Sequence, residues 1–156
     1  MDDLTIRRRR LPHWTLAGGT YFLTFRVRAA PLTAAERVLV RDHVVAGHGR
    51  YYELAAVVAM PDHAHALLSP LAGFTLSRVM QGIKGAAAHK LNLLRGATGA
   101  VWQAESWDRL VRDADEFDQK LGYMIANPVK AGLVADGLLF DGWWCQPDLA
   151  LPPPQE

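Results

Sequence analysis

Two histidines stand one residue apart in the short apolar segment MPDHAHALL, residues 60–68. Successive side chains of a β-strand point to opposite faces, so His63 and His65 share one face, with their bases roughly 6–7 Å apart. Two imidazoles at that separation can bind one metal ion, whereas Ala64 and Ala66 point to the other face and are expected to pack under a helix. An isolated pair of this kind is more often exposed or satisfied within a core, so a metal site needs further ligands.

The segment YMIANPVKAGLV, which begins at Tyr123, supplies two more polar groups. At about 100° per residue, the apolar residues before and within it share one arc of a helix: Phe117, Leu121, Met124 and Ile125. Tyr123 and Asn127 lie on a different side, one above the other. Asn127 is expected at the helix C-terminus, where the negative end of the helix dipole favours a cation. A boundary tyrosine and a capping asparagine are the ordinary readings, but with the two histidines they make three ligands and a nucleophile.

The hydrophobic pattern predicts the elements that position these groups. Residues 20–28 (TYFLTFRVR) are β-branched and aromatic, which is typical of a strand. Thr33 is predicted to cap a helix that runs to about residue 47, with Glu36 at the capping-box spacing. Two further strands, residues 51–60 and 63–69, are joined by a Pro-Asp turn and are therefore expected to be antiparallel neighbours.

The second half of the chain adds a helix, a strand and a last helix to this order. Thr75 caps a predicted helix of roughly twenty residues, and residues 100–111 are a strand or an irregular hairpin. Asp113 opens a last helix, which is expected to stop near Asn127 because Pro128 disfavours helical geometry before it. The order predicts an α+β fold: a ferredoxin-like βαββαβ antiparallel sheet with helices on one face, plus a C-terminal helix that carries the tyrosine.

Length and composition predict one domain. The chain has 156 residues, half of them hydrophobic, which is enough for a sizeable core. We expect the domain to span residues 1–148, with a basic N-terminal arm over about residues 1–14. Residues 149–156 are Pro-rich and are expected to be a disordered tail. The 17 Lys and Arg nearly balance the 16 Asp and Glu, so the distribution of charge matters more than its sum.

The same composition indicates a soluble, cytoplasmic protein. The single cysteine, Cys145, excludes an intramolecular disulfide and fits a reducing compartment. The longest apolar run, residues 54–60, is too short to span a bilayer, so no membrane partner is expected. The polar segment after the basic arm is unlike a signal peptide.

Beyond these patterns, the chain resembles a known family. MPDHAHALL matches the HUH motif (His, hydrophobic, His), and YMIANPVKAGLV resembles the tyrosine helix of single-tyrosine HUH transposases. The whole chain is similar to the REP-associated tyrosine transposases, which are relatives of insertion-sequence transposases with an HUH endonuclease fold. The similarity continues through RRRRLPHW, GGTYFLTFRV, GIKGAAAHKLN and VWQAESWDRLVRD. Ala64 departs from the family, which more often has a larger apolar residue such as Val there.

The resemblance implies roles for four residues. His63 and His65 would bind a divalent metal, Asn127 would be the third ligand, and Tyr123 would be the nucleophile. The implied reaction is cleavage and rejoining of single-stranded, hairpin-forming repeat DNA through a covalent 5′-phosphotyrosine intermediate. Mg²⁺ or Mn²⁺ is the expected cofactor, because phosphate oxygens suit hard cations and imidazole shifts the preference toward Mn²⁺.

Several residues are also predicted to contact DNA, and each of them has an alternative role that involves no DNA. The basic arm contains four consecutive arginines, which either bind phosphates or form a solvated arm: Arg7, Arg8, Arg9 and Arg10. Lys84 and Lys90 lie off the apolar stripe of their helix and are predicted to line a DNA groove, although charges there are commonly just solvated. Trp102 and Trp107 are candidates to stack on unpaired bases, with core packing as the competing role for at least one.

Two other functions and two assembly states remain open at this point. The first alternative is a catalytically silent, domesticated protein that binds DNA hairpins. The second is a small metal hydrolase built on the histidine pair, which leaves Tyr123 and Asn127 unexplained. The chain is either a homodimer, in which the tyrosine helix of one subunit completes the histidine site of the other, or a monomer.

Overall fold

The computed structural model describes residues 19–153, so the predicted arginine arm, Arg7 to Arg10, lies outside the described residues. In chain order, the elements are β1 (Thr20–Val27), α2 (Ala34–Ala46), β2 (Tyr52–Ala59), β3 (His63–Pro70), α3 (Leu76–Arg95), β4 (Trp102–Val111), α4 (Ala114–Lys130), the 3-10 turn η1 (Gly137–Leu139) and β5 (Trp143–Cys145). No helix in this range is both long and apolar enough to cross a membrane.

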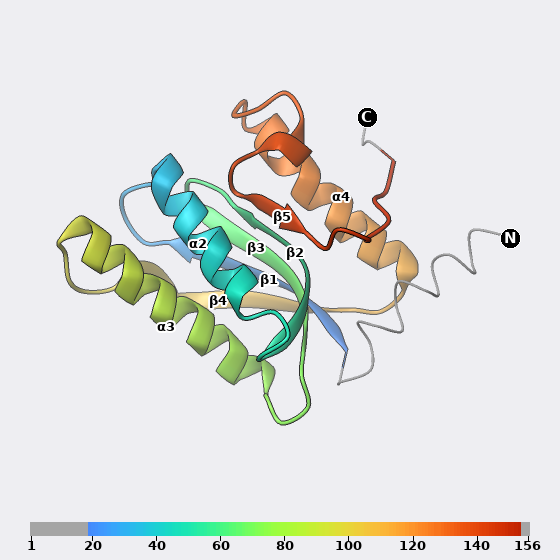
Figure 1. The fold of residues 1–156 in the computed structure, drawn as a ribbon, viewed down its shortest axis with the longest axis horizontal. Helices are drawn as coiled ribbons and strands as arrows, with labels where there is room; N and C mark the ends of the chain where they lie inside the picture. Colours follow the sequence, from blue (N-terminus) through green and yellow to red (C-terminus); the bar gives the residue numbers. More distant parts are fainter. Residues whose placement is uncertain (1–18, 154–156) are drawn as a thin grey trace, which may run out of the picture.

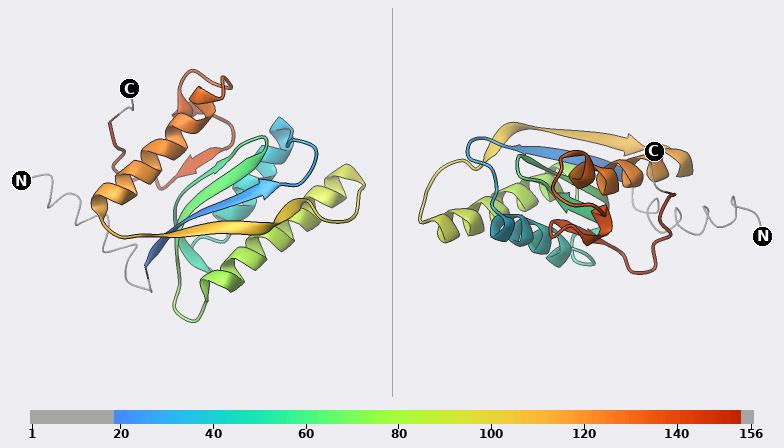
Figure 2. Two further views of the ribbon diagram at one scale, coloured as in Figure 1. Left: turned by 180° about the vertical axis from the view of Figure 1, so that it is seen from behind. Right: turned by 90° about the horizontal axis from the view of Figure 1, so that it is seen from above.

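The strands form one antiparallel sheet in the order β4-β1-β3-β2-β5. The helices α2 and α3 lie in front of the strands in Figure 1 and cover one face of the sheet. The helix α4 packs on the other face, which comes forward when the molecule is seen from behind (Figure 2, left). The predicted α+β fold, with two helices on one face and a C-terminal helix that carries the tyrosine, is confirmed.

Each face of the sheet has its own hydrophobic core, because side chains alternate along the strands. Leu23 and Phe25 of β1 pack under α2 and α3, whereas Phe22 of the same strand points to the α4 face and packs with Leu67 and Phe117. Burying a side chain of this size stabilises the fold by roughly 1.5–3 kcal/mol. Both faces of the sheet are therefore packed against helices, and the central strands are well placed to position the side chains of a site.

Capping residues fix where the helices begin, as the sequence predicts. The Thr33 hydroxyl accepts from the Glu36 backbone N–H at 3.2 Å, and the Glu36 carboxylate accepts from the Thr33 N–H at 2.9 Å. Glu36 also pairs with Arg95 of α3, which lowers the pKa of its carboxyl despite partial burial. The capping box thus begins α2 and ties it to the end of α3.

The predicted end of the last helix is wrong. The helix α4 continues through Pro128, which is buried, and ends at Lys130. Proline removes a single backbone donor, and the helix resumes at once, with the Ala131 N–H bonded to the Asn127 carbonyl at 3.1 Å. Tertiary packing of the proline ring thus overrides the local preference. Asn127 consequently lies within the last turn rather than at its end, where the helix dipole still favours a cation.

Sequence patterns did not specify two strands in the second half of the chain. Residues 102–111 form one continuous strand rather than an irregular hairpin, and the three-residue β5 pairs with β2 at the far edge. Leu149 then packs against the core under α4, and residues 149–153 have no regular secondary structure. The division of the chain at residue 148 stays a prediction.

Candidate active site

Strand register places both histidines on the face that α4 covers. β3 lies between β1 and β2, and its register sets His65 opposite Thr24 and His63 opposite Arg26. Ala64 and Ala66 are fully buried in the core on the other face, as predicted. The two imidazole centroids are 4.7 Å apart at an interplanar angle of 69°. The alternation of a single strand therefore brings the two rings together.

His65 is the buried member of the pair. Its side chain is 4% exposed and stacks on Phe22 at 4.8 Å, and its Nδ1 lies 2.9 Å from the Thr24 hydroxyl. Burial, the main cause, and electrostatic repulsion from His63 lower the pKa of His65 to about 3, so the His65 ring is neutral at physiological pH. Its Nε2 is buried without a hydrogen-bond partner among residues 19–153, which costs about 1–3 kcal/mol. A ligand on that atom would remove this cost.

His63 is held from one side and open on the other. Its Nδ1 lies 2.6 Å from the Asp62 carboxylate, and its Nε2 lies 3.4 Å from the Asn127 amide nitrogen. Burial is the largest single influence and acts to raise the pKa of Asp62, but the hydrogen bond to His63, the electrostatic attraction of His63 and Arg26 and a backbone hydrogen bond together outweigh it, so the net shift is downward. A carboxylate at Nδ1 keeps the proton there and presents the Nε2 lone pair to a ligand, as in many metal-bound histidines.

The helix α4 brings the remaining two predicted residues to the same place. The Tyr123 ring lies edge-on to His65, with centroids 5.5 Å apart at 70°, and its side chain is 45% exposed. Asn127 follows one turn later and reaches His63. All four residues that the sequence singled out therefore lie together within one chain.

The donor set suits a hard or borderline cation. The Nε2 of His65 has no partner among residues 19–153, and the Nε2 of His63 contacts the Asn127 carboxamide, which would present its oxygen to an ion if the amide were turned over. No group of three or more His, Cys, Asp or Glu side chains that could hold a metal exists among the described residues. An ion here would thus depend on the carboxamide, and it would keep positions free for phosphate and water.

A hollow of about 370 Å³ opens beside Tyr123. Its lining comes from β1, β3, β4 and α4: Phe22, Thr24, Arg26, His65, Trp107, Lys120 and Tyr123. None of these side chains is acidic, and Arg26 and Lys120 bring positive charge to the hollow that Tyr123 also lines. A phosphodiester could therefore approach Tyr123 without electrostatic repulsion.

The other predicted DNA contacts lie elsewhere. The Lys84 ammonium donates to the Gln103 carbonyl at 2.9 Å and to the Ser106 hydroxyl at 2.7 Å, so it holds β4 onto α3. Burial lowers the pKa of Lys84. Trp102 is 5% exposed, packs edge-on against Phe25 at 4.9 Å and donates to the Lys84 carbonyl. Its ring belongs to the core and offers no free face to a base.

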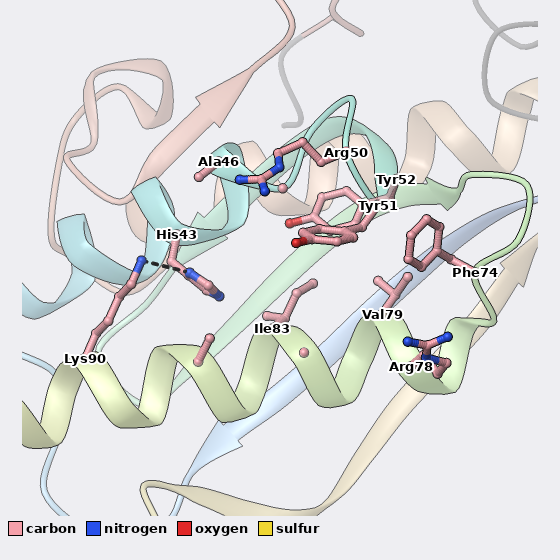
Figure 3. A pocket seen from close by; sticks show the side chains of 13 residues that line it. His43, Ala46, Arg50, Tyr51, Tyr52, Phe74, Arg78, Val79, Ile83 and Lys90 are labelled. Carbon is pink, nitrogen blue, oxygen red and sulfur yellow. Dashed lines mark hydrogen bonds between the residues drawn. The ribbon is translucent and has the colours of Figure 1, made fainter.

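A second cavity, of about 440 Å³, lies between α2 and α3 on the opposite face of the sheet (Figure 3). The predicted Lys90 lines it, with its ammonium 3.2 Å from His43 Nδ1. Arg50 lies over the Tyr51 ring at 5.4 Å, and Arg78 lies over Phe74 at 5.9 Å. The lining includes no acidic residue. Sequence patterns missed Arg50 and Arg78 because they come from a turn and a helix that only the packing brings together.

Comparison with known proteins agrees with this geometry. The family model described as "Transposase IS200 like" matches residues 45–110, which include both histidines and end before Tyr123. The "REP-associated tyrosine transposase" of Escherichia coli is 27% identical over 123 residues, or 76% of this chain and 72% of that protein. A protein of the same group from Haemophilus influenzae is 27% identical over 93 residues, 53% of each chain.

A solved structure extends the likeness to three dimensions. The REP-associated tyrosine transposase bound to a REP hairpin superposes with a TM-score of 0.65 at 25% identity, covering 78% of this chain and 73% of that chain. The fold of this chain is thus similar to that of a tyrosine transposase, and residues 45–110 match the IS200-like transposase family model. The chain is also similar to the REP-associated tyrosine transposases, and the resemblance predicted from its sequence is confirmed.

Proposed function

We propose that this chain is a metal-dependent, single-stranded DNA endonuclease and strand transferase that acts on hairpin-forming repeat DNA through a covalent 5′-phosphotyrosine. The observation that carries the proposal is the convergence of four groups on one surface of one chain. They are the two histidines of β3 and the two polar residues of α4: His63, His65, Tyr123 and Asn127.

Tyr123 acts as the nucleophile. Its hydroxyl oxygen attacks the phosphorus, the bond to the leaving 3′ oxygen breaks, and the products are a 5′-phosphotyrosine and a free 3′-hydroxyl. The phosphodiester energy is retained in the covalent intermediate, so attack by a 3′-hydroxyl reseals or transfers the strand without ATP. The half-exposed position of Tyr123 leaves its ring accessible to a strand, and its proximity to His65 supports a site formed within one subunit.

The divalent metal is Mg²⁺ or Mn²⁺, held by His63, His65 and Asn127. An ion held by these residues would supply positive charge to the phosphate of the scissile bond. Asp62 and Thr24 hold the Nδ1 atoms of the two histidines and so aim both Nε2 atoms at one point. The buried Nε2 of His65 supports this role, because no group of residues 19–153 forms a hydrogen bond with it.

The hairpin arm of the DNA binds outside the catalytic site. A structural relative is bound to a REP hairpin, and this chain carries a cationic groove of suitable chemistry between α2 and α3. Arg50, Arg78 and Lys90 form no ion pair with a carboxylate of residues 19–153, so their charges are free for phosphates. The arginine arm, Arg7 to Arg10, is proposed to add further phosphate contacts.

A covalent-adduct assay tests this proposal. Labelled single-stranded hairpins from the protein's own genomic neighbourhood are incubated with it and Mg²⁺ or Mn²⁺, then separated on a denaturing gel. The expected result is a shifted band that disappears in Tyr123→Phe and in His63→Ala. Hairpin binding without an adduct, with either ion, would instead support the catalytically silent DNA-binding protein.

A further inference from the structure

We infer a nucleotide subsite beside Tyr123, in which Trp107 stacks on the base of a nucleotide that flanks the scissile phosphate, while Arg26 and Lys120 bind adjoining phosphates. The inference rests on the proposed function and deepens it, because it says where the single strand runs over the protein. Three strands and one helix contribute to this subsite, which lies in the hollow next to the histidine pair.

Strand register puts Trp107 in line with the catalytic histidine. Thr24 of β1 is paired with His65 of β3 on one side and with Trp107 of β4 on the other. Residues directly opposite one another point to the same face of a sheet. Neighbouring strands are about 4.8 Å apart, so the Trp107 backbone lies roughly 10 Å from that of His65. A strand with its phosphate at Tyr123 therefore passes the tryptophan within a nucleotide or two.

The indole of Trp107 is exposed at the surface and is not packed in the core. Its side chain is 47% exposed, in contrast to the 5% of Trp102 on the same strand. The Arg26 guanidinium carbon lies 5.9 Å from the centroid of the Trp107 ring, a cation–π contact that orients both side chains. A large aromatic ring held at the surface beside an active site is suited to stacking on an unpaired base.

The two cations, Arg26 and Lys120, line the same hollow as the tyrosine. Lys120 precedes Tyr123 by one turn of α4, and its ammonium nitrogen lies 5.0 Å from the centroid of the Phe22 ring. Neither Arg26 nor Lys120 forms an ion pair with a carboxylate in the described part of the chain. Their charges therefore remain available for phosphates.

The combination indicates a single strand rather than a duplex. Stacking on Trp107 needs a base that has left its own stack, and paired bases in a helix do not offer that face. Cations without aromatic rings would suit duplex phosphates equally well, and an aromatic ring alone would suit any apolar ligand. The two kinds of group together, beside a tyrosine nucleophile, select an unpaired nucleotide.

The test is equilibrium binding of hairpin oligonucleotides whose single-stranded flank carries one abasic position at a time. The Tyr123→Phe background prevents cleavage. We expect an abasic nucleotide at one flanking position to weaken binding roughly tenfold. Trp107→Ala should weaken binding of the intact strand to a similar degree and be insensitive to that abasic position, while Trp107→Phe should keep most of the affinity.

The matched control is Leu110→Ala. Leu110 lies on the same strand as Trp107 and is similarly exposed, at 48%, but it is three residues further along and therefore faces the opposite side of the sheet. It should bind as the parent does. An unchanged abasic penalty in Trp107→Ala, or an equal loss in Leu110→Ala, would overturn the subsite.

The cations are tested by salt dependence. Arg26→Gln and Lys120→Gln should each reduce the slope of log binding constant against log salt by about one. Unchanged slopes in both variants would remove the phosphate contacts from the inference. These experiments measure binding constants, so they test the subsite independently of cleavage. Absence of the covalent adduct would count against the proposed function alone.

Discussion

At the scale of single residues, the two histidines have different environments that suit one task. His65 is buried, neutral and held at Nδ1 by Thr24, whereas His63 lies nearer the surface and is held at Nδ1 by Asp62. Each ring therefore has one nitrogen occupied and the other directed toward the site. A pair of merely exposed histidines would have neither the partners nor the common direction.

Thr24→Val tests this arrangement. Removing the hydroxyl frees the His65 ring to rotate and is expected to raise the Mn²⁺ concentration that gives half-maximal adduct by about 10- to 100-fold. Thr24→Ser, which keeps the hydroxyl, should resemble the parent protein. Metal titration of adduct yield measures both, and equal behaviour of the two variants would mean that Thr24 does not orient the ring.

At the scale of elements, the position of α4 decides whether the tyrosine reaches the histidines. The turn η1 packs against α4 so closely that a Cβ on Gly137 would lie 1.9 Å from the Ile125 carbonyl oxygen. Backbone atoms cannot move aside as a flexible side chain can, so only glycine fits there. The close approach of η1 therefore helps to hold the helix that carries Tyr123 and Asn127.

Gly137→Ala is accordingly expected to lower the free energy of unfolding by about 1–3 kcal/mol and to reduce adduct formation, because α4 must shift to accept the methyl group. The control is Gly85→Ala in α3, where a Cβ meets no atom within 4 Å. That change should be neutral or stabilise by up to about 1 kcal/mol, since alanine is the better helix former. Urea unfolding of both variants measures the difference, and equal stabilities would contradict the packing argument.

A second prediction at this scale concerns the contact between α2 and α3. The Arg95 partner lowers the pKa of Glu36 below its unfolded value, so this pair stabilises the fold above that value and the benefit is lost as pH falls through the folded pKa. Glu36→Gln keeps the capping-box geometry but removes the charge. It should cost about 1 kcal/mol at pH 7, and the difference should vanish in acid. Denaturant titrations at several pH values measure the difference in the free energy of unfolding. If Glu36→Gln lowers it equally at every pH, the effect comes from capping rather than from the ion pair.

At the scale of the whole molecule, the sheet separates two surfaces. The histidine site lies on the α4 face, and the cationic groove lies between α2 and α3 on the other. We therefore expect hairpin affinity and strand cleavage to respond to different substitutions. Arg50→Gln and Arg78→Gln should each weaken hairpin binding and reduce its salt slope by about one, yet leave adduct formation at saturating DNA unchanged.

Arg112→Gln is the control for net charge, since this arginine is 70% exposed and pairs with Glu116 away from the groove. It should change the salt slope far less than either groove variant. Binding isotherms at several salt concentrations provide the comparison. If all three arginine variants behave alike, the groove has no special role in holding the hairpin.

Much of the site could be predicted because it depends on local periodicity. The alternation of a strand puts His63 and His65 on one face, and the pitch of a helix puts Tyr123 and Asn127 on one side, whatever the rest of the chain does. Thr33 and Thr75 cap their helices through atoms only three residues away. Short-range geometry of the backbone is enough for all of these.

Only the tertiary structure decided which residues from distant segments contact these side chains. Trp102 and Trp107 look alike in the sequence, yet strand pairing buries the first and presents the second beside Thr24. Local preference ends the last helix before Pro128, whereas packing carries it through. The sequence by itself thus determined which side chains share a face, because neighbours in the chain obey backbone geometry. Contacts between distant segments depend on the whole core, and they decided which of these faces meet.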